Sequence, residues 1–335
     1  MATIKDVAKR AGVGVGTVSR VSAGSGPVSA AAAGRVRRAV EELRFRPSHA
    51  ARVLQKGQSQ TIGVFVPLVR GAFYTPILHA IYTTLRTYSR HMVVDFGQRL
   101  ESERQDALDA AEFLTDRGCD GLLIMGTALK SADIEHIAAL QPKFVLLNRC
   151  VPQFRAQCFN PDHEAAGAAA ARALCEAGHR RLALIEGPKA ATDNPLRRRG
   201  FMAALEGYGI APESVPRALG DFSPESGRLA VQTLLGRGRS FTALFCANDE
   251  MAIGALAGLR QAGLIVPRDL SVMGYDGIDL TALPVPPLTT VLIPWRQIAS
   301  HALHHLLNLC YGMSLPVERD IPAQVTWRDS IARLA

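Results

Sequence analysis

Short apolar runs alternate with amphipathic helical segments through most of this chain, from about residue 60 onward. Runs of this kind are typical of strands buried on both faces, which occur in parallel sheets covered by helices. Eight such strands are predicted, in two sets. They are 61–67, 92–97, 121–126 and 144–148, then 181–187, 216–220, 241–247 and 271–275. The two sets of strands together span more residues than a domain with one hydrophobic core usually contains. We therefore expect two doubly wound α/β halves.

The first sixty residues carry the whole net positive charge of the protein. They contain 11 Lys and Arg against 3 Asp and Glu, and the total net charge is +8. Charge gathered in one small segment is typical of a nucleic-acid partner, because Lys and Arg that neutralise phosphates release bound counterions. A solvated basic tail would lack helical periodicity, whereas Ile4, Val7, Ala8 and Ala11 fall on one helical face. This segment is therefore predicted to fold.

Three short helices are predicted in the basic segment. Thr3 and Asp6 form a capping pair before the first helix, and Gly12 ends it. A second helix follows at once, and a third begins after Ser29 as its cap and runs to a break at Pro47. Two helices joined by a tight turn and braced by a third make an all-α helix-turn-helix domain, whose second helix enters the major groove.

Three stretches of these helices carry a family resemblance. They are 3–13 (TIKDVAKRAGV), 17–21 (TVSRV) and 41–47 (EELRFRP). They resemble the headpiece of the lactose repressor and galactose repressor family, and later segments such as 147–149 (LNR) extend the resemblance, most closely to galactose-type repressors. The resemblance implies a DNA-binding transcriptional repressor that binds a palindromic double-stranded operator as a homodimer. It also implies allosteric control by a small ligand, a monosaccharide or simple glycoside.

The resemblance assigns base reading to the start of the second helix, at Val15 and Gly16. Because neither side chain can donate a hydrogen bond, Arg20 is the candidate for reading a guanine and Val15 for contacting a thymine methyl. Thr17 and Ser19 are either DNA contacts or local caps. The other predicted DNA-binding residues are Thr3, Ser29, Arg52, Leu54 and Lys56.

Residues 47–59 form a short helical linker. An isolated helix of under about 12 residues is marginal in water, so we expect this linker to order only when something holds it. By resemblance it is the hinge helix, in which Leu54 wedges between base steps of the minor groove while Arg52 and Lys56 contact phosphates. Packing within the helix is the alternative for Leu54.

For the rest of the chain, the resemblance implies a type I periplasmic-binding-protein fold of two parallel-sheet subdomains. The predicted organisation is a helix-turn-helix domain at 1–46, the hinge at 47–59, and an effector-binding and dimerisation domain at 60–335. Within that domain, the N-subdomain spans about 60–160 and 293–320, and the C-subdomain spans about 161–292 and 321–335.

Ligands of open parallel sheets bind beyond the carboxyl ends of the strands, so the two halves are expected to enclose a cleft there. By resemblance, Arg197, Asn248 and Asp276 reach this cleft, and amide and carboxylate groups suit neighbouring sugar hydroxyls. The other candidates are Phe73, Tyr74, Asn148, Arg149 and Phe222. For the aromatic residues, core packing is the alternative to stacking on a ligand. Asp249 is interpreted as a helix cap.

No catalytic or cofactor-binding pattern is found. The glycines of 12–16 follow a charged helix instead of the strand that a dinucleotide-binding loop needs. His301, His304 and His305 share a helical face but lack a completing ligand, so a solvated face is favoured over a metal site. The six cysteines form no Cys-x-x-Cys pair and are interpreted as reduced, buried thiols. We therefore expect neither an enzyme nor a bound cofactor.

The sequence also predicts location and assembly. No apolar export segment follows Met1 and no run of 18 apolar residues occurs, so a cytoplasmic, nucleoid-associated protein without membrane contact is expected. Palindromic half-sites require a symmetric dimer. Ile77, Ile81 and Leu85 on the helix at 73–88 are candidates for its interface, although they could equally pack on the sheet.

The expected mechanism is a shift of populations. A ligand that closes or twists the two halves would move the paired hinges and change the fraction of operator-competent dimers. Two other functions fit the α/β part alone. A sugar-binding transport component would need a secretion signal and no basic headpiece, and a sugar-metabolising enzyme would need a catalytic acid or base pair.

Overall fold

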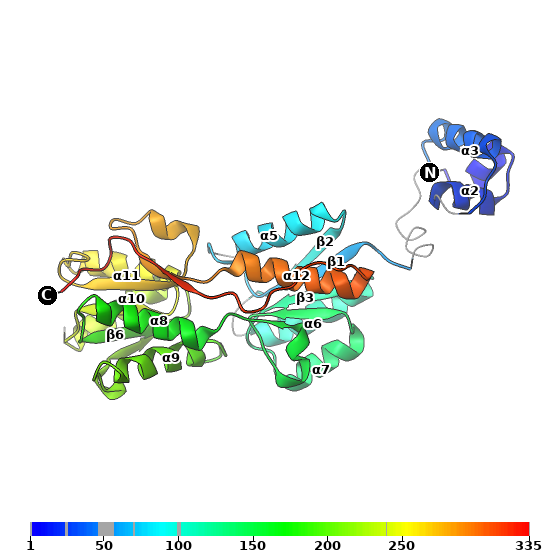
Figure 1. The fold of residues 1–335 in the computed structure, drawn as a ribbon. Helices are drawn as coiled ribbons and strands as arrows, with labels where there is room; N and C mark the ends of the chain where they lie inside the picture. The colour runs from blue at the N-terminus through cyan, green and yellow to red at the C-terminus, as the bar shows by residue number, and fades with distance from the viewer. Residues whose placement is uncertain are drawn as a thin grey trace. The chain divides into compact units, whose positions relative to one another are not determined.

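The computed structural model describes residues 2–23, 26–45, 57–69, 71–98, 102–238 and 240–334. The chain divides into two compact units, Met1–Gln60 and Thr61–Ala335 (Figure 1). The hinge candidates Arg52, Leu54 and Lys56, and the predicted break at Pro47, lie outside the described residues.

The first unit contains the three predicted helices, α1 (Ile4–Ala11), α2 (Val15–Ala23) and α3 (Ala30–Glu42). The capping box before α1 is confirmed, because Thr3 N donates to Asp6 Oδ2 at 2.8 Å and Asp6 N donates to Thr3 Oγ1 at 3.4 Å. Gly12 ends the helix with a φ of 65°, which a residue without Cβ adopts at least cost. Ser29 Oγ accepts from Ala32 N at 3.3 Å and caps α3.

The first lobe of the second unit is built on a parallel sheet in the order β2-β1-β3-β4-β5. The strands are β1 (Thr61–Val66), β2 (His91–Phe96), β3 (Gly121–Met125), β4 (Phe144–Leu147) and β5 (Cys158–Phe159). On one face lie α5 (Tyr74–Thr87) and α12 (Trp295–Tyr311), and on the other lie α6 (Glu103–Asp116) and α7 (Ser131–Leu140) (Figure 1). A short 3-10 helix, η2 (Pro152–Gln157), precedes β5.

The second lobe is built on a sheet in the order β11-β10-β9-β8-β6-β7, parallel except for β11. The strands are β6 (Leu182–Glu186), β7 (Arg217–Leu219), β8 (Ala243–Cys246), β9 (Ser271–Asp276), β10 (Thr289–Leu292) and β11 (Gln324–Thr326). Its helices are α8 (His163–Glu176), α9 (Asn194–Glu206), α10 (Pro224–Gly236) and α11 (Asp249–Gln261). The short turns η3 (Pro212–Ser214) and η4 (Asp279–Ala282) complete the lobe.

The chain passes between the two lobes three times. The passages are from β5 to α8, from β10 to α12, and from α12 to β11. All eight predicted strands are present, with ends that differ by one or two residues. The short strands β5, β10 and β11 were not predicted; each has at most four residues, which gives too little apolar pattern to identify from sequence.

The helix pairs of the second lobe touch backbone to backbone at glycines. A Cβ added to Gly200 on α9 would lie 1.8 Å from the carbonyl oxygen of Glu164 on α8, and one on Gly167 would lie 2.0 Å from that of Arg197. The same arrangement joins α10 and α11, where a Cβ on Gly254 would lie 1.7 Å from Pro224 O. Only glycine allows these distances. Gly167 and Gly200 therefore determine how closely α9, which carries Arg197, approaches α8.

We expect Gly200→Ala to destabilise the protein by about 1–3 kcal/mol, because backbone must move to admit the methyl group. Gly236→Ala, on α10 with no atom within 4 Å of the added Cβ, should instead be neutral or stabilise by up to about 1 kcal/mol. Equilibrium urea unfolding of both variants measures the difference. Equal stability of the two variants would contradict the close packing of α8 on α9.

Candidate functional site

The packing of α2 determines which of its side chains face outward. Val18 is fully buried with Val7 and Val36 in the core of the first unit. Gly16 and Arg20 are exposed on the opposite side of the helix, and Val15, the first residue of α2, is 42% exposed. The Arg20 side chain folds back along the helix, and its Nε donates to Gly16 O at 3.2 Å.

The other predicted DNA contacts lie at the helix starts or half-buried on α2. Thr17 and Ser19 are half-buried. Thr3 and Ser29 are both used as helix caps, as described above. Other cations of the first unit are exposed, including Lys5, Lys9, Arg37, Arg38 and Arg44.

A cavity of about 510 Å³ lies at the carboxyl ends of the strands of both lobes. That volume is within the range of about 300–1,000 Å³ that ligand sites usually have. Most of the predicted effector residues line it, namely Phe73, Tyr74, Asn148, Arg197, Phe222, Asn248 and Asp276. Arg149 does not: its Nε donates to Leu129 O at 2.6 Å and its Nη1 donates to Cys150 O at 3.3 Å, so it belongs to the loop after β4.

Left-handed backbone places three of these side chains at the cavity. Asn148, Phe222 and Asp276 have φ angles of 67°, 69° and 109°. Residues with a Cβ adopt such angles at a cost of about 1–3 kcal/mol, and strain of this kind gathers at functional sites. Each lies at or just beyond a strand end, where the turn directs the side chain into the cavity.

Five side chains, which we call the interlobe ring, connect the two lobes beneath the cavity. Asn148 Oδ1 lies 2.7 Å from His163 Nε2, and His163 Nδ1 lies 2.8 Å from the Tyr275 hydroxyl. The Arg197 guanidinium lies 3.7 Å from the Tyr275 ring centroid, and its Nη2 donates to Asp193 Oδ2 at 3.1 Å. Asn148 Nδ2 donates to the same carboxylate oxygen at 3.3 Å and closes the ring.

The charges of the interlobe ring follow from its burial. Burial lowers the pKa of His163 to about 4, so its imidazole is neutral at pH 7. With Nε2 donating to Asn148, Nδ1 is free to accept from the Tyr275 hydroxyl. Burial opposes ionisation of Asp193, but the Arg197 guanidinium and the partners His163 and Asn148 hold its pKa below the usual range. Arg197 Nη1 also donates to Ala247 O.

Two polar atoms of the ring are left without a partner. Asp193 Oδ1 and Arg197 Nε are buried and meet no hydrogen-bond partner among the described residues. Such atoms cost free energy unless something else satisfies them. Both residues line the cavity, but these two atoms are covered by protein.

The sequence prediction for the helix cap at 248–249 is wrong. Asn248, not Asp249, caps α11, because its Oδ1 accepts from Met251 N at 3.0 Å while its Nδ2 donates to Phe222 O at 3.0 Å. Asp249 is fully buried and accepts from Gly277 N at 2.7 Å. Burial raises the pKa of Asp249 to about 7.

Several cavity residues were not predicted from the sequence. They are Gln98, Glu103, Asp193, Asp221, Glu250 and Trp295 among others. Trp295 donates from Nε1 to Asp276 Oδ1 at 3.2 Å, and its ring meets that of Phe73 edge-on at 5.4 Å. The spacing of Asp193 and Arg197, four residues apart at the start of a helix, was the one available signal for that pair.

Further hydrogen bonds join the lobes beside the cavity, in addition to that between Trp295 and Asp276. Glu250 Oε1 accepts from Ala72 N at 2.6 Å, and Thr192 Oγ1 donates to Thr127 O at 2.9 Å. Together with Asn148 and Asp193, these bonds describe a closed arrangement of the lobes.

The remaining predictions have mixed outcomes. Ile77, Ile81 and Leu85 are buried in the core of the first lobe, so they pack on the sheet and do not form a dimer interface. Cys150 is exposed, contrary to the prediction of buried thiols; the other five cysteines are buried.

Within the described part of the chain, no group of three His, Cys, Asp or Glu side chains could hold a metal. No described helix is long and apolar enough to cross a membrane.

The chain matches two family models, the lacI family of bacterial regulatory proteins over residues 3–48 and a periplasmic binding protein-like domain over residues 171–331. It is 34% identical to the transcriptional regulator AscG of Escherichia coli K12, over 99% of this chain and 98% of AscG. It is 33% identical to GalR of the same organism, over 94% of this chain and 91% of GalR.

Two solved structures extend these similarities. The lac repressor dimer bound to operator and the anti-inducer ONPF has a TM-score of 0.86 at 28% identity, over 99% of both chains. A LacI-family regulator from Enterococcus faecium with bound ribose has a TM-score of 0.73 at 27% identity, over 82% of this chain and 100% of that chain.

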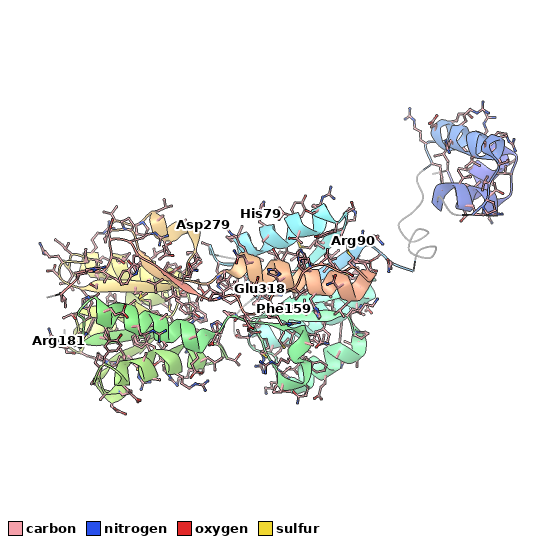
Figure 2. The ribbon with its side chains drawn as sticks, in the orientation of Figure 1. His79, Arg90, Phe159, Arg181, Asp279 and Glu318 are labelled. Atoms are coloured by element: carbon pink, nitrogen blue, oxygen red, sulfur yellow. The ribbon has the colours of Figure 1, made fainter. Side chains whose placement is uncertain are left out.

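The buried His163 predicts a pH dependence of stability. Because its pKa is lowered from about 6.5 to about 4 on folding, its contribution is present at pH 7 and is lost as the pH falls through that window. In His163→Gln, the loss of unfolding free energy between pH 7 and pH 5 should be smaller than in the wild type by about 2 kcal/mol. His79→Gln is the control, since His79 is exposed on α5 (Figure 2). Urea unfolding at both pH values tests this, and parallel pH profiles for wild type and His163→Gln would refute it.

Proposed function

The chain belongs to the lacI family of bacterial regulatory proteins and is a DNA-binding transcriptional regulator, and we propose that it represses from a palindromic operator as a homodimer. We propose further that a monosaccharide or simple glycoside, bound in the cavity of the second unit, controls its operator affinity. The observation that carries this proposal is a cavity lined from two lobes that lies in the same chain as a helix-turn-helix with an exposed, basic reading face.

The DNA half of the proposal rests on the exposed side of α2. Val15, Gly16 and Arg20 project from it while Val18 anchors the helix. The similar lac repressor dimer was solved on its operator. Arg20 would read a guanine through its guanidinium and Val15 would contact a thymine methyl, with Thr3, Thr17, Ser19 and Ser29 contacting the backbone nearby. Residues 47–59, with Arg52, Leu54 and Lys56, would be the hinge that connects the domain at 1–46 to the domain at 60–335.

The effector half rests on the chemistry of the cavity. Asn248, Asp276 and Arg197 provide hydrogen-bond acceptors and donors, and Phe73, Phe222 and Trp295 provide ring faces and edges. Polar groups among aromatic side chains suit a sugar, which has hydroxyls around its rim and apolar C–H faces. The similar regulator from Enterococcus faecium was solved with ribose. The named relatives are transcriptional regulators, and none of their names describes an enzyme.

The dimer would use a surface other than the buried side of α5. Leu283 and Val285, in the loop after η4, are 72% and 96% exposed. Large apolar side chains exposed together mark interaction surfaces. We propose that they contact a second copy of the chain, since the similar lac repressor is a dimer.

Base reading by Arg20 predicts a sequence-selective defect. Arg20→Ala should bind the operator more weakly by about 1–3 kcal/mol, with little change on random DNA. Lys9→Ala, at an exposed lysine of α1, should weaken both DNAs alike and reduce the salt dependence. The affinities of both variants for DNA from upstream of the protein's own gene and for random DNA are measured by gel shifts at several salt concentrations. If Arg20→Ala binds the operator as well as the wild type, the assignment is wrong.

Effector control predicts that one sugar of a panel changes the operator affinity of the wild type. Asp276→Ala removes a hydrogen-bonding group of the cavity and should raise the required sugar concentration about tenfold, since removing one partner of a buried hydrogen bond costs about 1–3 kcal/mol. Asp116→Ala is the matched control, because Asp116 lies exposed at the end of α6 and does not line the cavity. Gel shifts titrated with each sugar measure both. A panel of pentoses, hexoses and glycosides without effect on any shift would count against the proposal.

A further inference from the structure

An exposed cysteine lies beside a buried one in the first lobe. All six cysteines belong to the described part of the chain, and of these only Cys150, in the loop after β4, is exposed. Cys158 is buried at the start of β5, where its Sγ donates to Phe154 O at 3.1 Å. The same Sγ lies 3.9 Å from Val151 O, the carbonyl of the residue after Cys150, and its thiol is hydrogen-bonded to that of Cys150. The two sulfur atoms are therefore in contact.

The turn between the two cysteines brings them together. β4 and β5 are paired in parallel, with Leu147 opposite Phe159, the residue after Cys158. Directly after β4, Asn148 has left-handed backbone, and its N donates to Phe159 O at 3.0 Å. The chain then turns through η2 and enters β5. Because the two ends of this turn are hydrogen-bonded to one another, the fold itself keeps the two thiols in contact.

The turn lies at the connections between the lobes. Asn148, the member of the interlobe ring from the first lobe, comes two residues before Cys150, and the passage from β5 to α8 begins after Phe159 (Figure 2). On the passage from α12 to β11, Arg319 Nη1 donates to Cys158 O at 2.9 Å, and the guanidinium lies 4.3 Å from the Phe159 ring centroid. A change at the two cysteines therefore reaches the ring and two of the three passages between the lobes.

The two thiols differ in what can reach them. Burial raises the pKa of Cys158 to about 11, so this sulfur stays protonated at pH 7. Cys150 is exposed, so a dissolved oxidant can reach it. An accessible cysteine in contact with a second thiol is typical of redox-sensing pairs, in which the accessible sulfur is oxidised first and the second sulfur then completes a disulfide.

We propose that Cys150 and Cys158 are a redox-sensitive modification site, at which a hydroperoxide forms a reversible disulfide that loosens the interlobe ring. The Cys150 thiolate attacks one oxygen of the hydroperoxide, the O–O bond breaks, and the other oxygen leaves with the proton that Cys150 gave up, as water or an alcohol. Cys150 is then a sulfenic acid. The Cys158 sulfur attacks the Cys150 sulfur, the S–O bond breaks, and the departing hydroxide takes the Cys158 proton to form water. The pair has lost two electrons to the peroxide, and a dithiol returns them.

The disulfide changes the loop that follows Asn148. Cys158 loses its proton and the hydrogen bond that this proton makes. The new covalent bond also draws Cys150 toward β5. Because β5 is held by β4 and by Arg319, the exposed loop is the part that moves. Asn148 holds an acceptor and a donor of the second lobe at the same time, so a small change in its direction breaks at least one of these two bonds.

Trypsin separates the two cysteines, so mass spectrometry can detect a disulfide between them directly. Cleavage after Arg149, Arg155 and Arg172 gives the peptides 150–155 and 156–172, with one cysteine each. The reduced full-length protein is treated with hydrogen peroxide, its free thiols are blocked, and it is digested without reductant. We expect the two peptides to be joined, with a mass two hydrogen atoms below their sum, and dithiothreitol to separate them again.

Three variants assign the roles of the two sulfur atoms. Cys150→Ser, at an exposed position that leaves the core unchanged, should give no joined peptides. Cys158→Ser keeps a hydrogen-bond donor for Phe154 O and should stop at the sulfenic acid of Cys150, which dimedone traps. Cys175→Ser is the matched control, because Cys175 is a buried cysteine on α8, outside the turn. It should form the disulfide as the wild type does.

Hydrogen exchange followed by mass spectrometry measures the loosening of the ring. The Ala72 amide donates across the lobes to Glu250 Oε1 at 2.6 Å, and the Asn148 amide donates to Phe159 O at 3.0 Å. In the oxidised wild type, peptides with these two amides should exchange about threefold to tenfold faster than in the reduced protein, as the loss of one hydrogen bond implies. Peptides from the buried strand β8 should keep their rate. In Cys150→Ser, peroxide should change none of these rates.

Peptides that stay separate after peroxide treatment, or oxidation of Cys150 directly to a sulfinic acid in the wild type, would overturn the inference. Joined peptides with unchanged exchange at Ala72 and Asn148 would refute the loosening of the interlobe ring. These measurements use neither DNA nor a sugar, so their outcome is independent of the proposed function. A sugar panel without effect on the DNA complex would contradict the proposed function alone.

Discussion

The second unit depends on the interlobe ring, and within it on Asn148. This residue is the ring member from the first lobe, and its amide bonds both ways into the second lobe, accepting from His163 and donating to Asp193. Because an amide offers a donor and an acceptor a short distance apart, one side chain can hold a neutral imidazole and a carboxylate at once. Its left-handed backbone, with φ of 67°, directs the amide toward them. The same side chains that join the lobes therefore form part of the cavity wall.

The rest of the second lobe fixes the ring partners of Asn148 in place. His163 is the first residue of α8, and Asp193 and Arg197 lie at the start of α9. The glycine contact at Gly167 and Gly200 lets the backbones of these helices touch, so the three side chains keep their mutual distances. Tyr275, fully buried on β9, completes the platform on which the Arg197 guanidinium rests. Helix packing, not the ligand, therefore orients the guanidinium.

Local patterns in the sequence were sufficient for much of the fold and for part of the cavity. Continuous apolar runs predicted the long buried strands, and the polar residues directly after them, Asn148 and Asn248, were correctly expected at the cavity. The predictions that failed depended on the direction of a side chain, or on partners that are distant in the sequence. Arg149 follows Asn148 directly yet turns to Leu129 O, and the pairing of Glu103 with a turn 24 residues later has no periodic signal. From the sequence, Ile77 on α5 could pack on the sheet or form a dimer interface, and the packing of α5 on the sheet decides between the two.

A cavity wall shared by two lobes gives a bound ligand the means to shift the equilibrium between lobe arrangements. A ligand that interacts equally with open and closed lobes shifts no equilibrium, however tightly it binds. Here the cavity wall comes from both lobes, so a ligand that contacts both walls makes all of its contacts only when the lobes are closed. The difference in its interaction free energy between the two lobe arrangements is then the free energy available to shift the lobes and, under the proposed function, the operator affinity. Such coupling is reciprocal, so operator binding must change the affinity of the cavity for its ligand by the same factor.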